Sequence, residues 1–139
     1  MKAGDKHKTI LVVDDDNDYC ELTRLRLEGA GFEVLCACDG REALALLEKR
    51  YRPDLIIMDI DMPEKNGLTT LIELNVKGER LNPGEWQRPH VIVATGLEDG
   101  KIQAIMMNHR ADDYLKKPYT AHELIKKVTR FIGDVSRDQ

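Results

Sequence analysis

Acidic side chains stand directly after two apolar runs of the sequence. Asp14 and Asp15 follow "TILVV" (residues 9–13), and Asp59 ends "LIIMD", with Asp61 two residues later. Clustered carboxylates repel one another and raise one another's pKa unless a cation lies among them. Mg²⁺ suits such a group, because it takes hard oxygen ligands and is commonly shared between carboxylates and phosphate. A carboxylate can also be the nucleophile that forms an aspartyl phosphate.

Two further side chains complete this chemistry. Thr95 ends the apolar run "VIVAT", and Lys117 ends "DYLKK" just before Pro118. Their hydroxyl and ammonium groups are suitable donors for an incoming anion. Together with the acids they predict a site where an aspartate accepts a phosphoryl group and Mg²⁺ serves as the cofactor.

The alternation of strand and helix patterns explains how these residues meet. Short apolar, β-branched runs are typical of buried strands, and we expect five, at residues 9–13, 32–37, 54–59, 91–95 and 113–117. Helical patterns follow them at 18–31, 39–50, 67–78, 101–110 and 120–133. We therefore predict an α/β fold, a doubly wound five-stranded parallel sheet in the flavodoxin-like order 2-1-3-4-5, with three layers α/β/α. Such sheets bind ligands at the carboxyl ends of strands one and three, where the acids stand.

Smaller features of the helices are also predicted. In the first helix, Leu22, Leu25 and Tyr19 are expected to share one face. Asp39 and Thr120 each stand three residues before a glutamate, which is the spacing of a helix capping box.

The cysteines and the single tryptophan are interpreted as structural residues. Cys36 and Cys38 lie two apart on the second expected strand, so both point to one face. Metal binding and redox chemistry are open to such a pair, but burial on the sheet is favoured, because free cysteines are among the most buried residues. Cys20 is interpreted in the same way. Trp86, in the long connection before the fourth strand, is expected to hold that loop against the domain.

The composition is that of a single globular domain. The chain has 139 residues, of which 42% are hydrophobic and 33% charged. A formal net charge of −4 argues against direct nucleic-acid binding. No apolar run approaches the ~18–20 residues that cross a bilayer, and the first residues lack a signal peptide's apolar stretch. We therefore expect a cytoplasmic protein without membrane contacts.

Four motifs carry a resemblance to a known family. In order, "ILVVDDD", "PDLIIMDIDMPEKNG", "VIVATG" and "DDYLKKPY" resemble the receiver domain of two-component response regulators, the CheY-like family. The resemblance runs from about Thr9 to Ile132. It implies a receiver domain at 9–133, between a flexible N-terminus at 1–8 and a short tail at 134–139. The chain leaves no room for an output domain, so a stand-alone receiver is expected.

The resemblance implies a role for each acid. Asp59 would accept a phosphoryl group from the phosphohistidine of a sensor histidine kinase or phosphotransfer protein. Asp14, Asp15 and Asp59 would bind Mg²⁺ together with the backbone carbonyl of Asp61. The side chain of Asp61 adds negative charge near the phosphoryl group, so slower phosphorylation is expected than with a neutral residue there.

The resemblance also implies how the signal leaves the site. Lys117, with a cis bond to Pro118, would pair with the phosphoryl oxygens, and Thr95 would form a hydrogen bond to them. Thr95 and Tyr114 would be the switch residues, with the tyrosine ring turning inward. The face of helix four, strand five and helix five would then bind a downstream protein target, with the chain as a monomer or weak phosphorylation-dependent dimer. The protein would catalyse its own phosphorylation and dephosphorylation without being a dedicated enzyme.

Three other functions are considered. A phosphorylation-independent pseudo-receiver would be an interaction module on the same fold, but the intact set Asp14, Asp15, Asp59, Thr95 and Lys117 argues against it. "DIDMP" resembles the D-x-D motif of haloacid-dehalogenase-type phosphatases. In that family a small hydroxyl residue follows the motif and a second acidic pair lies downstream, whereas here Met-Pro follows and the acidic pair Asp14–Asp15 lies upstream. A flavin carrier would need a hydroxyl- and glycine-rich phosphate loop after the first strand, where "DDDND" would repel phosphate.

Overall fold

A single five-stranded sheet organises the chain. The computed structural model describes residues 8–61, 67–96, 100 and 111–134. All strands pair in parallel, in the order β2-β1-β3-β4-β5. They are β1 (Thr9–Val13), β2 (Glu33–Ala37), β3 (Leu55–Asp59), β4 (His90–Thr95) and β5 (Asp113–Lys116). The predicted fold class and strand order are confirmed.

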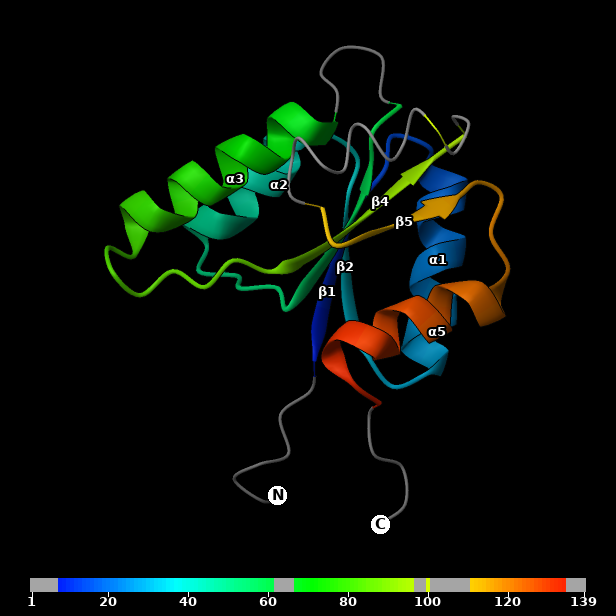
Figure 1. Ribbon diagram of the computed structural model, residues 1–139. Coiled ribbons are helices and arrows are strands. Elements are labelled where there is room, and N and C mark those ends of the chain that lie inside the picture. The colour runs from blue at the N-terminus through cyan, green and yellow to red at the C-terminus, as the bar shows by residue number, and fades with distance from the viewer. Residues whose placement is uncertain (1–7, 62–66, 97–99, 101–110, 135–139) are drawn as a thin grey trace.

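Helices cover both faces of the sheet. In the part of the chain that the structure describes they are α1 (Asn17–Gly29), α2 (Gly40–Glu48), α3 (Gly67–Leu81) and α5 (Ala121–Ile132). Figure 1 shows α2 and α3 on one face and α1 and α5 on the other, which gives the predicted three layers. The helix expected at 101–110 lies outside the described residues, as do 1–7 and 135–139 of the predicted termini. None of the described helices is long and apolar enough to cross a bilayer.

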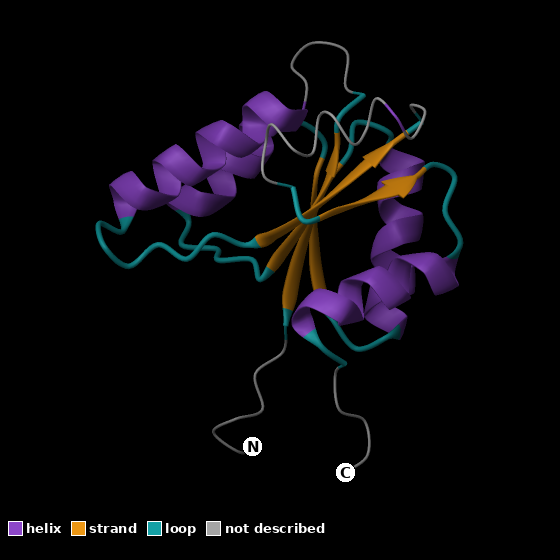
Figure 2. Cartoon of the chain, viewed as in Figure 1, coloured by secondary structure: helices purple, strands orange, loops and turns teal. Residues whose placement is uncertain are grey.

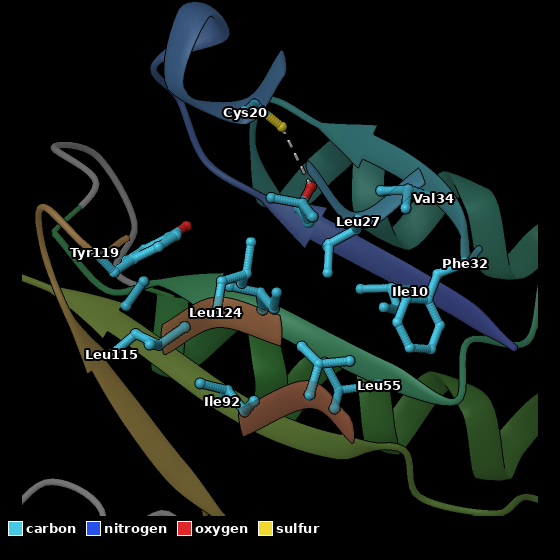
Figure 3. Close-up of a cluster of buried hydrophobic side chains, with 14 residues drawn as sticks. Ile10, Cys20, Leu27, Phe32, Val34, Leu55, Ile92, Leu115, Tyr119 and Leu124 are labelled. Carbon is cyan, nitrogen blue, oxygen red and sulfur yellow. Dashed lines mark hydrogen bonds between the residues drawn. The ribbon is translucent and has the colours of Figure 1, made fainter. Parts of the chain in front are cut away.

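Each face of the sheet has its own hydrophobic cluster. Successive side chains of a strand point to opposite faces, so β1 contributes Leu11 and Val13 to one cluster and Ile10 and Val12 to the other. The central strand β3 is buried along its whole length, which explains its uninterrupted apolar run. Figure 3 shows the cluster that includes Leu124 of α5. Packing on both faces fixes the ends of the central strands.

The helix N-termini follow the predicted caps. At α5, the Thr120 hydroxyl accepts from the amide of Glu123, and the Glu123 carboxylate accepts from the amide of Thr120. At α2, Asp39 accepts from the amide of Glu42, but the Glu42 carboxylate accepts from the amide of Cys38 instead. The capping box is therefore complete at α5, and at α2 the glutamate reaches one residue further back.

The buried face of α1 differs from the face predicted from its leucines. Leu22 and Leu25 are 41% and 54% exposed, whereas Thr23 and Leu27 are buried. The hydroxyl of the buried Thr23 lies 3.0 Å from that of Tyr119, so it has a hydrogen-bond partner inside the domain. A hydrogen-bonded threonine satisfies its polar group inside the domain, so a pattern that counts only apolar residues missed this face.

The prediction for the cysteines is confirmed only for Cys20, which is buried. Cys36 is exposed and Cys38 is half-buried. Cys36 lies on β2, an edge strand that is only partly covered, since Val34 and Ala37 are buried while Leu35 is exposed. Cys38 lies beyond the last residue of β2.

Trp86 holds the connection before β4 against α3, as predicted. Its indole N–H donates to the side-chain oxygen of Asn75 over 3.1 Å. The Arg52 guanidinium carbon lies 5.8 Å from the ring centroid. The ring also lies over Gly78, where a Cβ atom would come within 2.3 Å of ring carbons. The missing side chain at Gly78 is what allows this approach.

The strand register brings the predicted site residues together at the carboxyl ends of the strands. Asp59 lies opposite Ala94, and Thr95 lies opposite Lys116. Figure 2 shows the strand arrowheads pointing toward the same end of the sheet. Residues at or just after these positions therefore meet there.

Candidate functional site

Three predicted metal ligands lie together among the described residues. Asp14 follows β1 and Asp59 ends the neighbouring strand β3, and each is 3% exposed. Asp15 is exposed beside them. One carboxylate oxygen from each of the three acids lies within 4.8 Å of the others. The cluster thus has two buried acids and one exposed acid.

The two buried carboxylates are held in the same manner. Oδ1 of Asp14 accepts from the amide of Asp16 over 2.9 Å, and Oδ1 of Asp59 accepts from the amide of Asp61 over 2.9 Å. Each Oδ2 faces the ammonium of Lys117, at 2.9 Å for Asp14 and 3.4 Å for Asp59. One lysine therefore bridges the ends of β1 and β3.

Several contacts fix the position of Lys117 itself. Its amide donates to the carbonyl of Thr95 over 2.8 Å, and its bond to Pro118 is cis, as expected. The ammonium lies 4.7 Å from the ring centroid of Tyr19. Burial acts to lower the pKa of Lys117, but the hydrogen bond and charge of Asp14, aided by Asp59, outweigh burial and raise it. The side chain is therefore charged at neutral pH.

Burial raises the pKa of Asp59 to about 6, and the charge of Asp14 adds to the rise. The amide of Asp61 and the ammonium of Lys117 oppose this change. A cation bound near this buried carboxylate would stabilise its ionised form and lower its pKa.

The donor set fits Mg²⁺. Three carboxylates offer hard oxygen ligands at one point, and the exposure of Asp15 leaves room for the waters that Mg²⁺ usually keeps. Asp61 is linked to Asp59 through its amide, but the role of its backbone carbonyl as a ligand stays a prediction.

The side chain of Asp61 makes contacts that the sequence reasoning missed. The Thr95 hydroxyl lies 3.0 and 3.1 Å from its two oxygens, and the Gly96 amide donates to Oδ2 over 2.9 Å. Thr95 is fully buried. The register of β3 and β4 was the signal that could have revealed this pairing, since both residues lie just beyond the same point of the sheet.

Tyr19 and Tyr114 occupy different parts of the domain. The Tyr19 hydroxyl accepts from the amide of Tyr119 over 3.2 Å, which places its ring beneath Lys117. Tyr114 is half-buried on β5 against the cluster beside α2 and α3, and the Lys127 ammonium lies 4.7 Å from its ring centroid. The structure thus adds Tyr19 to the site, while the switch role of Tyr114 stays a prediction.

Comparison with known proteins decides the family. A family model described as "Response regulator receiver domain" matches residues 10–129. The chain belongs to this family. The receiver domain is 37% identical over 119 residues to "Transcriptional regulatory protein CpxR" of Klebsiella pneumoniae, a match that covers 86% of this chain and 47% of that protein. It is 33% identical over 129 residues to "Response regulator MprA" of Mycolicibacterium vanbaalenii, covering 93% of this chain and 52% of that protein. The chain spans about half the length of these curated relatives.

Solved structures agree with this assignment. The receiver domain matches the chemotaxis protein CheY4 of Vibrio cholerae with a TM-score of 0.78 and 27% identity, over 91% of this chain and 99% of that one. It matches response regulator TrrA of Thermotoga maritima, solved in complex with Mg²⁺–BeF, with a TM-score of 0.71 and 31% identity, over 89% of this chain and 98% of that one. Receiver domains act in two-component systems, between histidine kinases and downstream targets.

Proposed function

We propose that this receiver domain accepts a phosphoryl group on Asp59 from the phosphohistidine of a histidine kinase or phosphotransfer protein. The observation that carries the proposal is the placement of Lys117. Its ammonium contacts both Asp14 and Asp59, and one carboxylate oxygen from each of these acids and from Asp15 lies within 4.8 Å of the others. The similar TrrA structure was solved with Mg²⁺ and a beryllium fluoride, which supports an anion and a cation at such a site.

The proposed transfer makes the carboxylate of Asp59 the nucleophile. A carboxylate oxygen attacks phosphorus, an O–P bond forms, and the P–N bond of the phosphohistidine breaks with its electron pair passing to the imidazole nitrogen. Lys117 neutralises charge on the phosphoryl oxygens. When bound by Asp14, Asp15 and Asp59, Mg²⁺ supplies further neutralisation of that charge. Dephosphorylation is a separate step, in which water attacks phosphorus, the O–P bond to Asp59 breaks, and inorganic phosphate and the free carboxylate are formed.

The proposal extends to signal output. Thr95 and Lys117 connect the site to β4 and β5, because the Lys117 amide is bonded to the Thr95 carbonyl. A phosphoryl group would bias a two-state equilibrium in this region, including Tyr114, and change how β5 and α5 bind a downstream protein. The domain would act by protein contact, without touching nucleic acid or a membrane, and would not be a dedicated enzyme. Whether activation brings a weak dimer belongs to the same proposal.

Intact-protein mass after incubation with acetyl phosphate tests the acceptor. Wild type should gain one phosphoryl mass in the presence of Mg²⁺, and Asp59→Asn should gain none. Asp18→Asn is the matched control, because Asp18 is an exposed acid in the first turn of α1. It should be phosphorylated like wild type. No adduct in wild type, even when trapped quickly, would favour the pseudo-receiver, a phosphorylation-independent interaction module.

A further inference from the structure

The carboxylate of Asp61 takes the donors at the end of β4. Its oxygens accept from the Thr95 hydroxyl at 3.0 and 3.1 Å and from the Gly96 amide at 2.9 Å. Thr95 is fully buried at the end of β4, an interior strand of the sheet. Asp61 is exposed, yet its side chain accepts hydrogen bonds from two separate donors.

These donors lie beside the proposed phosphoryl acceptor. Asp59 pairs with Ala94, the residue before Thr95, and the Asp61 amide is bonded to Asp59 Oδ1. A phosphoryl group on Asp59 brings anionic oxygens to this end of the sheet, where a hydroxyl and an amide suit them as charge-assisted donors. Each donor has one hydrogen, so Asp61 and a phosphoryl oxygen compete for it.

We propose that the side chain of Asp61 is an internal anion that occupies Thr95 and Gly96 while Asp59 is unmodified and must leave them before a phosphoryl group can bind there. This inference rests on the proposed function of Asp59. It assigns Asp61 a positioning role beyond added negative charge. Asp61 holds the end of β4 in its unmodified arrangement, and it opposes phosphorylation twice, by occupying the donors and, once displaced, by repelling the phosphoryl oxygens.

A purely structural role for Asp61 predicts the opposite behaviour. If its carboxylate only positions Thr95 and Gly96 for the incoming anion, removing it loosens the donors and weakens anion binding. If it competes for them, removing it strengthens anion binding. The direction of the change in anion affinity therefore separates the two roles.

Two measurements on Asp61→Ala test the proposal, with Asp61→Asn as a milder variant and Asp18→Asn as the charge-matched control. The first is the proton chemical shift of the Gly96 amide without Mg²⁺. This resonance should move upfield in Asp61→Ala, because a hydrogen bond to a carboxylate is lost, and should be unchanged in Asp18→Asn. The shift requires neither phosphorylation nor a metal.

The second measurement is the apparent Kd of beryllofluoride in the presence of Mg²⁺, followed by amide resonances. Asp61→Ala should bind on the order of tenfold more tightly than wild type, the equivalent of one charge-assisted hydrogen bond that no longer has to be exchanged. Asp61→Asn should lie between them, since an amide oxygen is a weaker acceptor. Asp18→Asn should match wild type.

The outcomes separate this inference from the proposed function. Wild-type binding with equal or weaker binding by Asp61→Ala, or an unmoved Gly96 amide, would overturn the role of Asp61 and leave Asp59 as the acceptor. Absence of beryllofluoride binding in every variant would overturn both.

Discussion

Asp59 is a buried acid whose charge costs the folded protein stability. Its pKa is raised from 3.8 to about 6, chiefly by burial. Between these values the native state binds more protons than the unfolded state, so stability falls as pH rises from about 4 to 6. Above pH 6 the ionised group lowers the free energy of unfolding by up to about 3 kcal/mol.

We therefore expect Asp59→Asn to stabilise the protein at pH 7.5 without Mg²⁺. The gain should be about 1 kcal/mol, less than the full cost of the charge, because the asparagine amide is itself a polar group that must be buried at this position. At pH 4 the gain should shrink, since wild-type Asp59 is then mostly protonated. Urea unfolding at both pH values checks this, and a gain of equal size at both would contradict it.

Asp15 provides the test of the metal site, because it is exposed and its replacement leaves the buried contacts of the site intact. Wild type should be stabilised by Mg²⁺, by about 1.4 kcal/mol at ten times the Kd. Asp15→Asn should need several-fold more Mg²⁺ for the same rise in Tm, since one hard oxygen ligand has lost its charge. Asp18→Asn should respond like wild type. Equal Mg²⁺ responses in all three proteins would remove Asp15 from the ligand set.

At the scale of the elements, Gly78 and Trp86 join α3 to the connection before β4. Replacement of a helical glycine by alanine usually stabilises by up to ~1 kcal/mol. At Gly78 the new Cβ would lie 2.3 Å from Trp86 ring carbons, so we expect a loss of about 1–3 kcal/mol instead. The Trp86 fluorescence should shift to the red as the ring leaves its position.

Gly29→Ala in α1 is the matched control for this change. A Cβ atom at Gly29 meets nothing within 4 Å, so that variant should be neutral or slightly stabilised. Urea unfolding of both variants, with Trp86 emission recorded alongside, gives the comparison. Stabilisation of Gly78→Ala would show that the ring moves aside without loss.

The sequence was most informative where backbone pattern alone determines structure. The buried strands β1, β3 and β4 read as continuous apolar runs. The strand order was predicted correctly because the alternation of strands and helices indicated a doubly wound sheet, for which this order is common. It was least informative where a polar contact or a sheet edge overrides composition. Thr23 is buried with its hydroxyl in contact with that of Tyr119, and Cys36 is exposed on the partly covered edge strand β2.

At the scale of the whole molecule, the same distinction holds for the site. Fold topology brings Asp14, Asp59 and Lys117 together, since each stands at or just after a strand end. The register of β3 and β4 places Asp61 near Thr95, but the hydrogen bonds between the two side chains depend on side-chain geometry, which no periodicity encodes. Topology thus predicts which residues meet, and the coordinates are needed to show how their hydrogen bonds are shared.

The two edges of the sheet should respond unequally to the proposed activation. Lys117 follows the edge strand β5 and bonds to Thr95 at the end of β4, whereas β2 forms the opposite edge. An anion that draws on Thr95 and Lys117 should therefore change amide hydrogen exchange in β5 more than in β2. Exchange measured by mass spectrometry, with and without beryllofluoride and Mg²⁺, checks this expectation. Asp59→Asn should show no such change in exchange. An equal change of hydrogen exchange in β2 and β5 would mean that the site stiffens the domain as a whole and does not act through β5.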